Sequence, residues 1–204
     1  MDPTPYLEPR PGPRPVLDHL AERADRPRFM IPDGRGGFRP ITWREHAQEL
    51  EDVALFCRDR GLRPGDRAAI FAHNRVEWMS AALGIQAAGG VMVPIYPAST
   101  TDQAAYIVSH SEAAILFVAG AELLPRALAL WASAPELHTL VVLDDASVSV
   151  ALAELRARSI ATPADDRLER GIVRWPALRQ RGRALAEAEP ARFTGILDQV
   201  ELRH

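Results

Sequence analysis

The six histidines are the side chains best suited to bind a metal, and three of them, His19, His46 and His73, are spaced by 27 residues each. Their sequence neighbours share no pattern, so this spacing does not indicate a structural repeat. A helical zinc site needs two histidines four residues apart with a carboxylate nearby, and the sequence contains no such pair. We therefore predict no metal-binding residue.

A phosphate-binding loop needs glycines between a strand and a helix, hydroxyl groups and usually a lysine. The charged glycine cluster Gly34-Arg35-Gly36-Gly37 lies in a predicted hairpin turn, which is the wrong place for such a loop. Ser99-Thr100-Thr101 lies between a predicted strand and a predicted helix, but without glycine its hydroxyls are better suited to capping the helix. All 24 basic residues are arginine, which excludes any step that needs a lysine ammonium. We predict no catalytic residue and no cofactor-binding residue.

Two dipeptides, His73-Asn74 and Tyr96-Pro97, each follow a predicted strand directly. In open parallel sheets, ligand crevices form at the carboxyl ends of the strands. Position therefore makes both pairs candidates for a crevice, although their local roles as cap and turn residues explain them equally well.

The charged clusters have simpler interpretations. Adjacent carboxylates at Asp144-Asp145 and Asp165-Asp166 point in different directions, so we expect solvated turn residues rather than a cation site. Late in the chain, Trp175 is surrounded by arginines at positions 174, 179, 181 and 183. Nearby glutamates dilute this charge and the net charge is only -3, so we predict a solvated helix face and no nucleic-acid partner.

The single cysteine, Cys57, excludes an internal disulfide. It shares a predicted helical face with Trp43, Ala47, Leu50 and Ala54, which indicates a buried core thiol rather than a nucleophile. The N-terminus lacks the basic start and apolar run of a signal peptide, and we expect a soluble, cytoplasmic protein.

The elements that must position these groups alternate between strands and helices. A hairpin is predicted at 28–41, and strands are predicted at 68–72, 91–96, 114–118 and 139–143. Helices are predicted at 16–24, from Thr42 to Gly61, and at 75–88, 101–111 and 121–134. Thr42 with Glu45, and Asn74 with Glu77, have capping-box spacing. This order predicts an α/β fold with a mostly parallel sheet, right-handed crossovers and flanking helices.

The ends of the chain carry weaker signals. Residues 1–15 are rich in proline and predict an extended leader. After Asp145 we predict helices at 148–158 and 176–189 with a loop at 159–170 between them. Residues 193–204 have some strand character but supply no closing element, so the chain reads as interrupted.

Three segments resemble the adenylate-forming enzymes, and in particular their long-chain acyl-CoA synthetase branch. The segments are Thr42-Trp43-Arg44-Glu45 followed by 60–67, then Asn74-Arg75-Val76-Glu77-Trp78 with 87–100, and 103–112 with the strand after it. The resemblance covers about Val16 to Asp145, and a fainter echo at Trp175-Pro176-Ala177-Leu178 with Gly182 resembles the connector that precedes the nucleotide motif of the family.

This resemblance implies a ligase that joins a fatty acid to coenzyme A through an acyl-adenylate, with ATP and Mg²⁺ as cofactors. It implies three segments: a leader at 1–15, an α/β N-terminal part of the AMP-binding domain at 16–145, and a helical connector at 146–204. The fold would be an incomplete piece of the large domain of these enzymes. The phosphate loop and the catalytic lysine of the family have no counterpart here, so no catalytic residue is carried over.

Three hypotheses follow from these observations. The chain is a fragment of an acyl-CoA ligase, inactive alone; or a split-enzyme subunit that needs a second, C-terminal complementing chain; or a non-catalytic binding module. The implied partners of the completed enzyme are fatty acid, ATP and coenzyme A, with peripheral membrane association through the lipid substrate as a further option.

Overall fold

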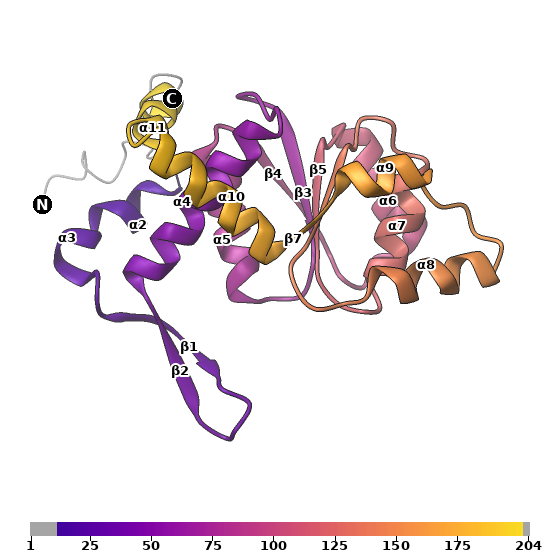
Figure 1. The fold of residues 1–204 in the computed structure, drawn as a ribbon, viewed down its shortest axis with the longest axis horizontal. Coiled ribbons are helices and arrows are strands. Elements are labelled where there is room, and N and C mark those ends of the chain that lie inside the picture. Colours follow the sequence, from indigo (N-terminus) through magenta and orange to yellow (C-terminus); the bar gives the residue numbers. More distant parts are fainter. Residues whose placement is uncertain (1–11, 202–204) are drawn as a thin grey trace, which may run out of the picture.

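A five-stranded sheet forms the centre of the molecule (Figure 1). The computed structural model describes residues 12–201. The strand order is β4-β3-β5-β6-β7, and every neighbouring pair is parallel, so the predicted α/β fold with a parallel sheet is confirmed. The strands are β3 (Arg67–Phe71), β4 (Val91–Ile95), β5 (Ile115–Val118), β6 (Thr139–Val142) and β7 (Ile172–Arg174).

Helices cover both faces of this sheet. One layer contains α4 (Trp43–Asp59), α5 (Val76–Ala87), α10 (Trp175–Ala188) and α11 (Arg192–Glu201). The other layer contains α6 (Thr101–Ser111), α7 (Leu124–Ala132), α8 (Val148–Ala157) and α9 (Asp165–Gly171). Because side chains alternate along a strand, Ala68 and Ile70 of β3 face the first layer, and Ala69 and Phe71 face the second.

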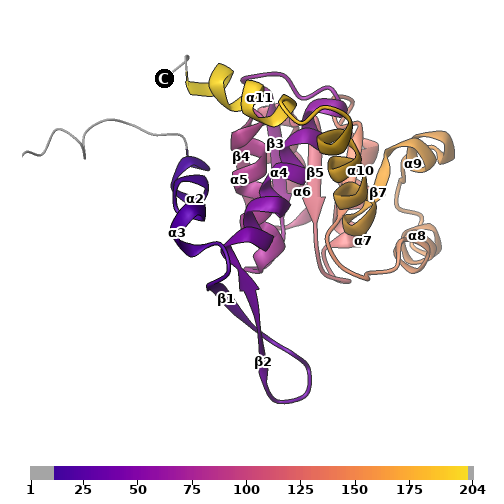
Figure 2. The ribbon, with the colours of Figure 1, turned by 60° about the vertical axis from the view of Figure 1, so that its left-hand side comes forward.

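A hairpin of β1 (Pro27–Pro32) and β2 (Phe38–Thr42) extends away from the sheet and its helices (Figure 2). The Gly34–Gly37 cluster forms its turn, as predicted, and Gly34 and Gly36 have φ of 75° and 87°. The helix predicted at 16–24 is present as two short pieces, α2 (Arg14–Asp18) and α3 (Leu20–Arg23). Most of the predicted leader at 1–15 lies outside the described residues.

Helix starts follow the capping pattern at two of three predicted places. Thr42 Oγ1 accepts a hydrogen bond from the Glu45 N–H at 3.1 Å, and Glu45 Oε2 accepts one from the Thr42 N–H at 2.7 Å. Thr100 and Gln103 make the same reciprocal pair, so the hydroxyl of Thr100 does cap α6 as predicted. The cap predicted at Asn74 is wrong, because α5 begins one residue later with Arg75 as its extended N-cap and no side-chain cap.

The exposed edge of the sheet is protected by a proline. In the edge strand β4, the Val91 N–H points toward β3 and donates to the Asp66 carbonyl. Backbone groups alternate in direction along a strand, so those of residue 94 point away from β3, toward the free edge. Pro94 has no N–H to offer there, which removes a donor from the free edge. This edge is therefore a poorer template for strand addition than the unprotected edge that an interrupted sheet would present.

The C-terminal predictions need three corrections. The predicted loop at 159–170 contains the start of α9, and the unpredicted strand β7 follows it, too short to show a period in sequence. Residues 193–201 belong to helix α11 rather than to a strand, because Phe193, Ile196, Leu197 and Val200 all bury on one helical face. The helices predicted at 148–158 and 176–189 are confirmed as α8 and α10.

In the arginine cluster around Trp175, Arg181 and Arg183 lie on a solvated face as predicted, but the prediction is wrong for Arg179. Arg179 reaches into the layer between α10 and α4, donates to Glu49 at 2.6 Å and pairs with the fully buried Asp52. The Arg179 side chain is only 16% exposed. Arg181, by contrast, is half exposed and pairs with Asp59.

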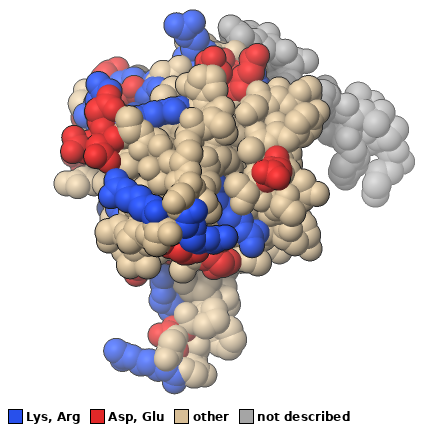
Figure 3. All heavy atoms as spheres, turned by 90° about the vertical axis from the view of Figure 1, so that its right-hand side faces the viewer, with Lys and Arg blue, Asp and Glu red and all other residues tan. Residues whose placement is uncertain are grey.

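Burial settles the expectation for the single cysteine. Cys57 is fully buried, and burial raises the pKa of its thiol, so it is the inert core residue that was predicted. Among residues 12–201, no helix has the length and apolarity needed to cross a bilayer. On the face that carries α8 and α9, acidic and basic side chains lie interspersed among uncharged ones (Figure 3).

Candidate functional site at the carboxyl edge of the sheet

The carboxyl ends of five parallel strands meet at one edge, so residues that are far apart in the sequence gather there. Neighbouring strands β3 and β4 place the two predicted crevice pairs, His73-Asn74 and Tyr96-Pro97, at this edge. The turn after β5 adds Gly120 and Glu122, and the turn after β6 adds Asp144. The edge was predicted correctly, but its most connected residue is one that the sequence interpretation assigned to solvent.

Asp144 is the centre of the network at this edge. Its Oδ2 accepts hydrogen bonds from the Gly120 N–H at 2.7 Å and from Arg75 Nη1 at 3.3 Å, and its Oδ1 accepts from the Ala146 N–H at 3.1 Å. The side chain is 26% exposed. The prediction of a solvated turn residue is therefore wrong for Asp144, which ties together the segments that follow β3, β5 and β6. Asp165 and Asp166 do lie exposed, in the first turn of α9.

Two arginines fix the geometry around this carboxylate. Arg75 pairs with Glu77 at 2.8 Å as well as with Asp144. Burial acts to lower the pKa of Arg75, but the hydrogen bonds and charges of Glu77 and Asp144 outweigh it and raise that pKa, so the guanidinium stays charged. Arg174, at the end of β7, donates to the backbone carbonyls of Asp144 and Ala146 at 3.2 and 2.7 Å.

His73 is the one imidazole at the described part of this edge. Its Nε2 lies 3.4 Å from Glu122 Oε1, and both side chains are more than half exposed. This pair lies on the rim, where an imidazole can exchange hydrogen bonds with a bound molecule or with water. Asn74 is exposed beside it.

The loop after β4 is held from the second helical layer. Arg126 of α7 donates to the Ser99 carbonyl at 3.1 Å, and the Thr100 cap fixes the start of α6. Tyr96 is 74% exposed, so its ring is available to a neighbouring surface. His73-Asn74 and Tyr96-Pro97 thus share an edge, where His73 contacts the Glu122 carboxylate and the Tyr96 side chain is exposed.

The donor set at this edge does not fit a nucleotide triphosphate. The Gly120 N–H, which a phosphate would need, already donates to Asp144. The nearby guanidiniums of Arg75 and Arg174 are engaged with Glu77, Asp144 and backbone carbonyls. Within the part of the chain that the structure describes, no three His, Cys, Asp or Glu side chains group closely enough to hold a metal ion. The hydrogen bonds of Asp144, Arg75 and Arg174 hold the loops of this edge in place.

The Arg75–Asp144 connection was the main feature that sequence interpretation missed. A signal was present in the sequence. Asp144 directly follows the predicted strand 139–143, just as His73 directly follows the predicted strand 68–72. Applying the same edge rule to all strands would have identified Asp144. Nothing in the sequence pairs it with Arg75, because 69 residues separate the two.

The chain was compared with known proteins. The family model of the AMP-binding enzymes matches residues 17–181. The long-chain-fatty-acid–CoA ligase FadD15 of Mycobacterium bovis is 32% identical over 142 residues, which cover 64% of this chain and 24% of the ligase. A second relative is a CoA ligase of Rhodococcus jostii, whose name gives a methyl-dioxo-octahydroindenyl propanoyl group as its substrate. It is 34% identical over 80 residues, which cover 39% of this chain and 16% of that protein.

Solved structures show the same fold. The adenylation domain of a carboxylic acid reductase from Segniliparus rugosus, in complex with AMP and a carboxylic acid, aligns with a TM-score of 0.66 and 18% identity over 84% of this chain and 30% of that one. The anthranilate CoA ligase AuaEII, in complex with anthranoyl-AMP, aligns with a TM-score of 0.63 and 22% identity over 80% and 30% of the two chains. The present chain spans about a quarter of the length of the FadD15 ligases it matches.

Proposed function

Because the chain belongs to the family of AMP-binding enzymes, we propose that it forms the N-terminal part of the AMP-binding domain of a fatty acid–CoA ligase. In the complete enzyme, a fatty acid carboxylate would attack ATP to give an acyl-adenylate and pyrophosphate, and the coenzyme A thiol would then displace AMP. ATP, Mg²⁺ and coenzyme A would bind mainly to residues outside this chain. Residues 16–145 would supply four strands of the sheet, and 146–204 would supply the connector together with the edge strand β7.

The observation that carries this proposal is the 142-residue match to FadD15, a fatty-acid ligase by name. The carboxyl edge of that sheet offers a rigid rim held by Asp144 and Arg75 and contains no free phosphate-binding backbone amide at Gly120. We therefore propose that the isolated chain is not active, and that its role in the enzyme is to position neighbouring segments.

A chimera tests the fatty-acid assignment. Residues 17–181 of this chain replace the matching segment of the M. bovis FadD15 ligase, and fatty-acid-dependent exchange of pyrophosphate into ATP is measured. We expect exchange that depends on a long-chain fatty acid. A chimera that unfolds cooperatively, as the parent does, but supports no exchange would contradict the proposal.

Two further arms separate the remaining alternatives. The purified chain alone should give no exchange, and robust exchange would overturn the inactivity proposal. Mixing it with a FadD15 polypeptide that lacks the matching segment tests the split enzyme. If the mixture restores exchange, the result favours a split enzyme with a complementing chain. If the mixture shows no exchange while the chimera is active, the result favours a segment that works only within one polypeptide.

A further inference from the structure

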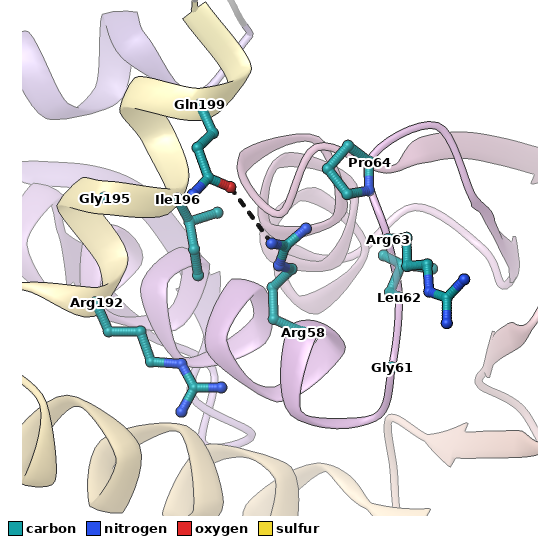
Figure 4. Close-up of a pocket in the computed structure, with 9 residues that line it drawn as sticks. All are labelled: Arg58, Gly61, Leu62, Arg63, Pro64, Arg192, Gly195, Ile196 and Gln199. Carbon is teal, nitrogen blue, oxygen red and sulfur yellow. Dashed lines mark hydrogen bonds between the residues drawn. The ribbon is translucent and has the colours of Figure 1, made fainter.

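A pocket of about 480 Å³ lies at the opposite, amino edge of the sheet (Figure 4). Its walls are the last turn of α4, the turn 61–64 that leads to β3, and the outer face of α11. Leu62 and Ile196 are 2% and 6% exposed and provide apolar wall. Gly61 and Gly195 leave open space, since a Cβ on either would meet no atom within 4 Å.

Two guanidinium groups flank this pocket. Arg58 of α4 and Arg192 of α11 extend along its sides, whereas the Arg63 side chain extends away from them (Figure 4). Within residues 12–201, the hydrogen-bond partner of the Arg58 guanidinium is the neutral Gln199 amide, whose Oε1 lies 3.5 Å from Arg58 Nη2. Arg192 pairs with Glu189 at 3.1 Å, and that carboxylate is 61% exposed. Arg58 therefore has N–H groups that can donate to a ligand. Solvent screens the ion pair between Arg192 and Glu189, so this pair competes only weakly with a ligand.

The acidic groups nearby do not neutralise the pocket. Asp59 is held by both guanidinium nitrogens of Arg181 at 2.9 Å, and Asp66 accepts from the Arg63 N–H. The free carbonyls at the end of α4, which would repel an anion, already accept hydrogen bonds from the backbone N–H groups of residues 60–62. The local field is thus dominated by the arginines.

The pocket is separate from the carboxyl edge, and one of its walls lies outside the segment that defines the family. Arg192, Gly195, Ile196 and Gln199 form its α11 wall, and all of them lie beyond residues 17–181, which match the family model. We propose that this pocket binds a small organic phosphate. Its phosphate would bridge Arg58 and Arg192, and its apolar group would lie against Leu62 and Ile196, because paired guanidiniums match phosphate oxygens and these side chains offer apolar contact.

Calorimetric titration of the purified chain with phenyl phosphate tests the proposal, with inorganic phosphate and neutral benzyl alcohol as comparison ligands. We expect a dissociation constant of about 1 mM or tighter for phenyl phosphate at low salt, and weakening as salt is added. Inorganic phosphate should bind more weakly, because it lacks the apolar group.

Three variants locate the binding. Arg58→Gln should weaken phenyl phosphate binding about tenfold by removing a charged donor. Gly195→Leu should weaken it by about as much, because the side chain fills the pocket while the helical position tolerates leucine. Arg35→Gln, at the exposed hairpin turn, is the matched loss of one charge and should leave the affinity unchanged.

Two results would overturn the proposal. No heat of binding up to about 10 mM phenyl phosphate would overturn it. Equal binding by wild type, Arg58→Gln and Gly195→Leu would place the ligand elsewhere and overturn it as well. Each variant is first checked for a wild-type unfolding midpoint, and Gly195→Ala provides a second, smaller filling of the same space if leucine disturbs the helix.

Discussion

The two faces of the sheet are built from different chemistry. All four fully buried polar residues among those the structure describes, His46, Asp52, Ser80 and Thr139, lie on the α4 side or on strand positions that face it. The α7 side is packed by apolar residues, with Trp131 at its centre. On the α7 side the helices come from one continuous stretch of sequence, whereas on the α4 side α4 packs against α10, which begins more than a hundred residues later.

This difference shows where polar contacts are needed. Apolar packing is non-directional, and it suffices where short connections already bring helices together. A distant helix must find one register on its partner, and the buried pairs of Arg179 with Glu49 and Asp52 provide directional contacts for that. Gly182 allows the approach, because a Cβ there would lie 2.4 Å from the Asp52 backbone. The predictions below test this contrast.

Arg179→Met should have the largest effect. It removes the cation of Glu49 and leaves Asp52 with only the half-exposed Arg183, whose Nε lies 3.5 Å from Asp52 Oδ2. Breaking a buried pair on one side costs about 3–5 kcal/mol of unfolding free energy. Urea unfolding measures the loss. Arg181→Met is the control, since the Arg181 side chain is half exposed and solvent screens its pair with Asp59, so the loss of stability should be far smaller.

A triple variant separates charge from packing. Adding Glu49→Gln and Asp52→Asn to Arg179→Met removes the unpaired charges, so most of the lost stability should return. If the triple variant is as unstable as Arg179→Met alone, the shape of arginine rather than its charge holds α10 on α4, and the contrast between the faces fails.

Acid should weaken the α4 side next. His46 is fully buried, and neither ring nitrogen has a hydrogen-bond partner among the residues that the structure describes. Burial, and then the charge of Arg28, lowers its pKa from 6.5 to about 4. The folded state therefore binds a proton at His46 less readily than the unfolded state does. The contribution of neutral His46 to the free energy of unfolding is fully present above about pH 6.5. It is lost as the pH falls toward 4, which lowers the stability by roughly 3 kcal/mol.

The variant His46→Leu isolates this contribution. The difference in unfolding free energy between wild type and His46→Leu should change between pH 7 and pH 4, in favour of the variant at acid pH. Phe29, whose ring lies edge-on to His46 at 5.0 Å, is the hairpin residue that should move first. A difference that stays constant with pH would show that His46 is not the acid-sensitive group.

Sequence interpretation worked where the determinants are local. The capping boxes at Thr42 and Thr100, the apolar strands and the buried Cys57 are all encoded within a few residues, and the family resemblance from these segments is confirmed. It failed where the partner is distant. Neither Arg179 nor Asp144 shows its burial in its neighbours, and composition alone assigned both to solvent.

The errors near the C-terminus have another cause. The spacing of Phe193, Ile196, Leu197 and Val200 is helical, so the period was readable, but β-branched residues suggested a strand. For β7, three residues are too few to carry any period, and the strand forms because β6 offers it a free edge. The Asn74 cap failed because Arg75 extends toward Asp144 and takes the cap position itself.

Trp131→Phe should have the smallest effect of the three and should complete the contrast. The indole N–H donates to the Leu137 carbonyl, but Arg167 donates to that same carbonyl at 2.7 Å, so the substitution leaves no buried acceptor unpaired. The cost is then the lost volume and a weaker contact with the Arg167 guanidinium, which lies 5.4 Å from the ring centroid, about 1–2 kcal/mol in all. It should be the same at pH 7 and pH 4, because no group that titrates in this range is involved. Urea unfolding at both pH values measures it. A loss as large as that of Arg179→Met, or one that grows in acid, would mean that the α7 side also depends on a directional polar contact.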